Sequence, residues 1–264
     1  MERKSEIMGK IIPKDIEVVV ASYGGVGTTF FLDFVSQFKK TNDPQDEDKI
    51  KHLVIPPVSF NKNVRFVYIY GNPVEAVPSL FGRGMANFQS KKLQRDQQII
   101  NEPIPLDATL EEYAIAGVDK FQFRKHFYNW YRDCLMHPTL FIRYEKIWDH
   151  KEEIFRFLGL PMSELENFPE KKQRRSKLDD LPQPVLEGLI DMYGDFAKEL
   201  DEIGECVLRG EHYAGKISHT LCSRNLRIAI RREIGVGLNE KFPKIYRKLL
   251  GFRASLSRRG HSSR

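Results

Sequence analysis

The first forty residues hold the feature that most constrains the fold of this chain. Residues 16–21 (IEVVVA) form a short β-branched run, which is typical of a buried strand. Residues 22–27 follow with three glycines in six positions, and residues 28–39 (TTFFLDFVSQFK) have the apolar spacing of a helix. A strand, a glycine-rich turn and a helix in this order predict an α/β unit built on a parallel sheet.

The rest of the chain continues the alternation of strands and helices. We expect further strands at 64–70 (VRFVYIY) and 139–144 (TLFIRY), and helices from 75, over 110–135, over 151–158 and through most of 178–210. Residues 88–105 are polar and contain two prolines, which favours an irregular excursion. The predicted fold is α/β in three layers, a mostly parallel sheet flanked by helices. We expect a single domain over residues 1–254 and a basic flexible tail over 255–264.

Composition excludes several classes of protein. With 264 residues, 41% hydrophobic and 30% charged, the chain is not disordered throughout. Its longest apolar runs are too short for a membrane span, and residues 1–14 lack the apolar core of a signal peptide. Three cysteines without close spacing argue against a disulfide framework or a cysteine zinc site, so we expect a cytoplasmic protein (Cys134, Cys206 and Cys222).

The modest net charge of +6 is unevenly distributed. Basic residues gather at 171–177, at 224–232 and at 243–264. Such clusters suit an anionic ligand, phosphate included, without identifying it. Only the basic tail favours nucleic acid, and we expect no nucleic-acid partner.

The glycine-rich turn has the properties of a phosphate-binding loop. It comes between a strand and a helix, at the edge of a parallel sheet where ligands bind. Glycines let the backbone approach an anion, and the first N–H groups of the helix point toward it. The alternative is a tight turn in which glycine serves packing only. The loop is not a Walker A motif, because no Gly-Lys-Ser/Thr is present.

Four segments resemble motifs of the sulfotransferases that use 3′-phosphoadenosine-5′-phosphosulfate (PAPS). Residues 21–30 (ASYGGVGTTF) resemble the family's 5′-phosphosulfate loop, T-Y-P-K-S-G-T-T-W. Residues 67–79 (VYIYGNPVEAVPS) are similar to its 3′-phosphate segment. Residues 140–145 (LFIRYE) with 157–161 (FLGLP), and then 237–242 (GLNEKF), resemble two later segments in the family's order. The resemblance implies a P-loop-like sulfotransferase architecture, PAPS as donor, PAP as product, and no metal.

The resemblance also assigns roles to individual residues. The 5′-phosphate would lie on the loop, on Gly24, Gly25, Val26, Gly27, Thr28 and Thr29. Phe30 stands where the family has a tryptophan that stacks on adenine, and the alternative for it is a core aromatic. Ser79 matches the serine that holds the 3′-phosphate, and Arg224 is matched to a late family arginine.

His52 is the candidate general base. It lies in KHLVIPP, at the place of the family's K-T-H-x-P. A base that removes the hydroxyl proton assists sulfuryl transfer, and histidine suits the task because its ordinary pKa is ~6.5. The alternative is a loop histidine without a function. His126 is expected to pack within an aromatic helix.

Two departures from the family affect charge. Gly25 replaces the loop lysine that neutralises the leaving phosphate, and Gly71 replaces the arginine that binds the 3′-phosphate. Another basic side chain must then compensate, or activity is impaired or redirected. Candidates by composition are Lys62, Arg65, Arg83 and the 224–232 cluster.

Three functions remain open from sequence alone. The first is sulfuryl transfer from PAPS to a hydroxyl or amine of a small-molecule or carbohydrate acceptor. The second is a sulfotransferase-like protein that binds a nucleotide or a partner without catalysis. The third is a P-loop-type kinase, which would need a loop lysine and a carboxylate ligand for Mg²⁺, such as Glu145.

Overall fold

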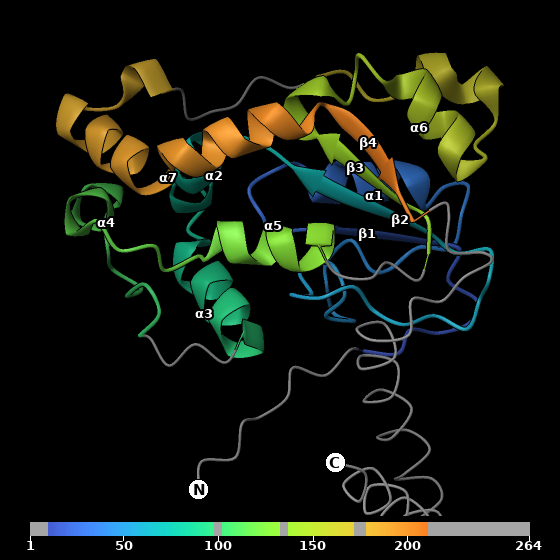
Figure 1. Cartoon of the computed structure of the whole chain (residues 1–264), viewed down its shortest axis with the longest axis horizontal. Coiled ribbons are helices and arrows are strands. Elements are labelled where there is room, and N and C mark those ends of the chain that lie inside the picture. The colour runs from blue at the N-terminus through green and yellow to red at the C-terminus, as the bar shows by residue number, and fades with distance from the viewer. Residues whose placement is uncertain (1–9, 98–101, 133–136, 172–177, 211–264) are drawn as a thin grey trace, which may run out of the picture.

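A four-stranded sheet forms the centre of the molecule (Figure 1). The computed structural model describes residues 10–97, 102–132, 137–171 and 178–210. The strands lie in the order β1-β2-β3-β4, with β1 to β3 parallel and β4 antiparallel to β3. Their bounds are β1 (Val18–Ser22), β2 (Arg65–Tyr70), β3 (Thr139–Arg143) and β4 (Cys206–Arg209). The predicted α/β class, with a mostly parallel sheet flanked by helices, is confirmed.

Seven α-helices surround this sheet in the described part of the chain. They are α1 (Thr28–Val35), α2 (Pro73–Phe81), α3 (Ala86–Gln97), α4 (Leu110–Ala116), α5 (Phe123–Arg132), α6 (Lys151–Leu158) and α7 (Gln183–Ile203). The helix predicted over 151–158 is confirmed, and it ends at Gly159 with a φ of 63°.

Two helical predictions need correction. The single helix expected over 110–135 is two helices, because Gly117 closes α4 in the left-handed region with a φ of 63°. The irregular excursion expected over 88–105 is helical in its first part, where α3 runs to Gln97. The apolar pattern did not predict this helix, because its buried side chains include the polar Gln89 and Ser90 as well as Leu93.

Helices cover both faces of the sheet, which explains why every residue from Phe66 to Tyr70 is buried. Side chains alternate along β2, and Tyr68 contacts the Phe127 and Trp130 rings of α5 at 5.7 and 5.2 Å. Figure 1 shows α5 on one side of the sheet, with α1 and α6 on the other. Most of the buried apolar residues form one cluster around this sheet.

The carboxyl ends of the three parallel strands lie at one edge of the sheet. Ser22 is in register with Ile69, and Tyr70 is in register with Arg143. The segments that follow these strands therefore meet. The Tyr23 hydroxyl accepts a hydrogen bond from the Gly71 N–H at 2.9 Å and donates to the Gly71 carbonyl, which joins the glycine-rich turn to the end of β2.

Some predictions fall on residues outside the described part. These are the basic tail over 255–264, the 224–232 cluster, Arg224, Cys134 and Cys222. Cys206 is a half-buried free thiol. No helix among the described residues is long and apolar enough to cross a membrane.

Phe127 should contribute strongly to stability, because its ring lies between α5 and β2. Its centroid is 5.7 Å from Tyr68 and 5.3 Å from Tyr70, and it is fully buried. We expect Phe127→Ala to lower the free energy of unfolding in urea by about 3–5 kcal/mol. Leu106→Ala is the control, because Leu106 is 85% exposed and should change stability by less than about 0.5 kcal/mol. Equal effects of the two variants would contradict this packing.

Candidate functional site

The glycine-rich turn adopts a backbone conformation that requires glycine. Gly24, Gly25 and Gly27 have φ values of 97°, 75° and 67°. A Cβ on Gly27 would lie 2.3 Å from Cε2 of Tyr144, and one on Gly25 would lie 2.8 Å from the Ala76 carbonyl oxygen. These glycines therefore serve both the left-handed conformation and close packing. Left-handed turns of this kind can point successive N–H groups toward an anion.

Internal hydrogen bonds hold this turn in place. The Ser22 and Thr28 hydroxyls bond each other at 2.6 Å, and the Gly24 N–H donates to Ser22 Oγ at 3.1 Å. The Gln89 side chain on α3 donates to the Tyr23 carbonyl at 2.9 Å. The Thr28 hydroxyl thus bonds within the turn, whereas Thr29 Oγ1 accepts from Lys51.

A cavity of about 430 Å³ gathers most of the predicted site residues. From the turn and α1 come Gly24, Gly25, Gly27, Thr28 and Thr29. The segment before β2 adds Lys51 and His52, and the α2–α3 region adds Arg83 and Gln89. Lys51 and Arg83 are the cationic side chains of this lining, and no described lining residue carries a carboxylate. The cavity is therefore suited to an anionic ligand.

Lys51 is the basic residue that sequence reasoning missed. Its Nζ donates to Thr29 Oγ1 at 3.2 Å and to the Pro44 carbonyl at 2.5 Å. Burial lowers the pKa of this ammonium, although nearby aspartates including Asp43 oppose the shift. Lys51 therefore brings a cation to the turn that lacks a lysine at position 25. Its place directly before His52 was the only signal for it in the sequence.

Of the other basic residues considered as substitutes for the loop lysine, Arg83 lies at the cavity, whereas Arg65 and Lys62 do not. Arg83 lines the cavity, and its Nε donates to the Ser79 carbonyl at 2.9 Å. Arg65 lies at the amino end of β2, away from the carboxyl ends where the cavity is, and its guanidinium lies 5.3 Å from the Phe157 ring centre. Lys62 precedes Arg65 and is likewise absent from the cavity lining.

His52 lies in the cavity with one ring nitrogen fixed. Its Nδ1 is 2.8 Å from the Ser22 carbonyl oxygen, which can only accept, so Nδ1 carries the proton. The other nitrogen, Nε2, then keeps its lone pair. Burial lowers the pKa of His52 to about 3, against the opposing effect of the Ser22 hydrogen bond. The ring is therefore neutral near pH 7, and burial makes its unprotonated Nε2 a weaker base than an exposed imidazole.

Three predicted residues lie outside the cavity lining. Val26 is fully buried, so its side chain belongs to the core. Phe30 is half-buried and stacks on Trp148 at 5.5 Å, within an aromatic group that includes Tyr144 and Phe168. Ser79 lies half-buried on α2 and offers its carbonyl to Arg83.

A carboxylate stands next to Gly71, which the sequence resemblance matches to an arginine for the 3′-phosphate. A Cβ on Gly71 would lie 3.0 Å from Oε1 of Glu145. Glu145 Oε2 accepts from Arg143 Nε at 3.3 Å. Negative charge at this place disfavours a phosphate there, even though Arg143 offsets part of it.

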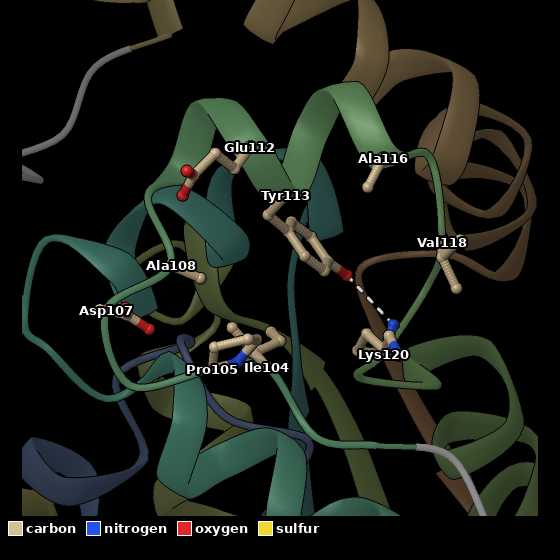
Figure 2. Close-up of a pocket in the computed structure, with 9 residues that line it drawn as sticks. All are labelled: Ile104, Pro105, Asp107, Ala108, Glu112, Tyr113, Ala116, Val118 and Lys120. Carbon is tan, nitrogen blue, oxygen red and sulfur yellow. Dashed lines mark hydrogen bonds between the residues drawn. The ribbon is translucent and has the colours of Figure 1, made fainter.

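A second cavity, of about 560 Å³, lies between α4 and residues 104–108 and 118–120 (Figure 2). The Tyr113 ring projects from α4 toward Lys120, whose N–H donates to the Tyr113 hydroxyl at 3.2 Å. The Glu112 carboxylate accepts from the N–H and the hydroxyl of Thr109 at the start of α4, and Lys120 Nζ donates to the Glu102 carbonyl. These charged groups serve the fold, and none of the predicted site residues lines this cavity.

No group of three or more His, Cys, Asp or Glu side chains that could hold a metal ion occurs in the described ranges.

The buried histidines should make stability depend on pH. Burial lowers the pKa of His52 to about 3 and that of His126 to about 4, compared with ~6.5 in an unfolded chain. At a pH between the folded and the unfolded pKa, the unfolded chain binds more protons than the folded one. The contribution of each buried neutral histidine to the free energy of unfolding is therefore full above pH ~6.5 and falls as the pH drops. We expect a slope of up to roughly 1.4 kcal/mol per pH unit for each histidine. Urea unfolding between pH ~7 and ~5 measures it.

The matched control is His52→Gln, which removes one titrating ring. Its stability should fall less than that of the wild type between the two pH values. An identical pH dependence of the two proteins would show that His52 does not titrate as a buried neutral group.

A scan against protein-family models finds no match to this chain, and a search of the curated proteins finds no significant match.

Proposed function

We propose that this protein transfers a sulfuryl group from PAPS to a hydroxyl or amine of a small-molecule or carbohydrate acceptor. One observation carries the proposal: the glycine-rich turn, Lys51 and an imidazole with a free Nε2 line the same cavity. The order of the sequence motifs gives a second, independent reason for it.

Binding of the donor's 5′-phosphosulfate end is supported by the charge and shape of the cavity. The turn offers left-handed glycines and the start of α1, which favour an anion. Lys51 lies against Thr29 of this turn, and Arg83 lines the same cavity. The residues present therefore fit this end of the donor without a metal ion.

His52 is the proposed general base. The donor supplies an activated sulfuryl group when bound. Nε2 of His52 takes the acceptor's proton while the acceptor oxygen or nitrogen bonds to sulfur, and the bond from sulfur to the bridging phosphate oxygen breaks. The electron pair of that bond stays on the phosphate of PAP, and the proton leaves His52 afterwards. The negative charge of the bound donor would raise the pKa of His52 from its low value, because a nearby anion favours the protonated ring. Acid–base assistance by a base whose pKa lies near the working pH is typically worth ~10²–10⁴-fold in rate.

Lys51 is the proposed substitute for the missing loop lysine. Negative charge grows on the bridging oxygen as the bond to sulfur breaks, and a nearby ammonium stabilises it. The lowered pKa of Lys51 reflects burial, and an anionic donor would hold the side chain in its charged form. Loss of one such preorganised group typically costs ~2.7–4 kcal/mol of transition-state stabilisation.

Glu145 favours a second candidate function, binding without sulfuryl transfer. Its carboxylate lies beside Gly71, where the family places positive charge for the 3′-phosphate. A ligand with a 5′-phosphate but no 3′-phosphate would avoid this repulsion. The two candidates differ in their preference for the 3′-phosphorylated nucleotide.

The direct test is calorimetric titration with PAP, with and without Mg²⁺, and with ATP for comparison. We expect metal-independent binding that prefers PAP. Lys51→Met should weaken this binding about 10-fold or more, because a charged hydrogen bond is worth about 1.5–3 kcal/mol. Lys62→Met is the matched control, since Lys62 lies outside the cavity, and should bind PAP as the wild type does.

Turnover with labelled PAPS and a panel of acceptors then tests His52. His52→Ala should retain PAP affinity and lose at least ~10²-fold in kcat. Absence of PAP binding, or equal binding of ATP only with Mg²⁺, would refute sulfuryl transfer. The Mg²⁺-dependent result would favour the kinase alternative.

Glu145→Gln tests the 3′ end of the proposed donor site. Removal of the negative charge should tighten PAP binding by a few-fold, and more at low salt, since the interaction is electrostatic. Adenosine 5′-phosphate, which lacks the 3′-phosphate, should gain much less. An equal gain for the two nucleotides would mean that the 3′-phosphate binds elsewhere.

A further inference from the structure

The candidate base is carried by an irregular segment rather than by a strand or helix. Residues 51–53 lie in the connection between α1 and β2, and they make a turn. A reacting side chain needs its position held to a fraction of an ångström, and loops hold side chains less well than helices and strands do. Something outside the segment must therefore fix the His52 ring.

Three successive carbonyls of this segment each accept a hydrogen bond from another element. The Lys51 carbonyl accepts from the Ser22 N–H at 3.0 Å. The His52 carbonyl accepts from His126 Nε2 at 3.4 Å, and the Leu53 carbonyl accepts from Trp130 Nε1 at 2.7 Å. The peptide on each side of the His52 side chain is thus tied to the sheet or to α5.

His126 and Trp130 can act together because of helical spacing. Residues four apart in a helix lie on the same face, one above the other. Both side chains are fully buried between α5 and the sheet, and both contact Tyr68. On this otherwise apolar face, His126 Nε2 and Trp130 Nε1 are the polar atoms that bond the 51–53 segment.

The protons of this arrangement have one consistent assignment. The His52 carbonyl can only accept, so His126 carries its proton on Nε2. His126 Nδ1 then accepts from the Tyr68 hydroxyl at 2.8 Å. Burial also keeps His126 neutral, since it lowers the pKa of that ring to about 4. Tyr68 on β2 thereby selects the tautomer that donates to the segment.

We propose that His126 and Trp130 are positioning residues, which hold the peptide of His52 so that Nδ1 stays on the Ser22 carbonyl and Nε2 stays unprotonated. The catalytic part of this inference rests on the proposed function, but the positioning itself does not. When the segment loosens, Nδ1 loses its fixed acceptor, and the proton divides between the two ring nitrogens.

Trp130→Phe is the sharpest variant, because it removes the Nε1–H and keeps an aromatic ring in the core. Tyr113→Phe is the matched control: it removes a buried hydroxyl that bonds Tyr193 and Lys120 instead of residues 51–53. Circular dichroism and urea unfolding establish whether each variant is folded before its signals are compared. His126→Gln, which keeps an amide donor, is compared with His126→Leu, which has none.

Nitrogen-15 NMR of the imidazoles provides a readout that needs no substrate. His52 is assigned by its loss in His52→Gln. In the wild type we expect protonated Nδ1 and unprotonated Nε2, and in Trp130→Phe a shift of both nitrogens toward the averaged values of mixed tautomers. Tyr113→Phe should keep the wild-type signals, and His126→Gln should stay closer to them than His126→Leu.

Turnover gives the second readout. Misplacement of a reacting group by about 1 Å can cost roughly 10²-fold, so Trp130→Phe should lower kcat about 10–100-fold. The KM for PAPS should change less than about 2-fold, because the bond lost is outside the cavity lining. Unchanged His52 signals in Trp130→Phe, or Nε2-protonated His52 in the wild type, would overturn the positioning role. Shifted signals in a protein without sulfuryl transfer would uphold the role and refute the proposed function instead.

Discussion

Four residues of the candidate site are hydrogen-bonded to Ser22, the last residue of β1. Its N–H donates to the Lys51 carbonyl, and its carbonyl accepts from His52 Nδ1. Its hydroxyl bonds Thr28 at the start of α1 and accepts from the Gly24 N–H. Ser22 is fully buried, so these bonds are shielded from water, and an unmade one would be costly. The strand end therefore fixes the turn, the helix start and the imidazole relative to one another.

The parallel sheet makes this convergence possible. Because β1, β2 and β3 run in the same direction, their carboxyl ends and the residues after them share one edge. Tyr23 joins the first two of these ends through Gly71, and Glu145 after β3 accepts from the Asn72 N–H at 3.5 Å. On the opposite side of His52, α5 contributes His126 and Trp130. The 51–53 segment, which carries His52, thus lies between the end of β1 and an aromatic helix.

The sequence alone predicted what depends on local pattern. A β-branched run, three glycines and a helical apolar spacing predicted β1, the turn and α1, and the structure confirms all three. The order of the motifs selected His52 from seven histidines as the candidate base, and that role stays a prediction. Lys51 and His126 were not predicted as site residues, because their roles depend on how a loop and a helix face meet in space. α3 was missed because its buried positions include Gln89 and Ser90, which do not produce an apolar pattern. The sequence likewise did not predict that Glu145 lies beside Gly71, because this contact depends on the pairing of β2 with β3.

We propose that the turn after β1, together with Lys51 and His52, binds the phosphosulfate end of the donor. The most direct measurement is a crystal structure of the complex with PAP. We expect the 5′-phosphate within hydrogen-bond distance of backbone N–H groups of the glycine-rich turn and of Lys51 Nζ. His52 Nε2 should then face the position that the sulfuryl group would occupy. PAP bound in the second cavity near Tyr113, or with its 5′-phosphate away from the turn, would show that the turn does not bind the donor.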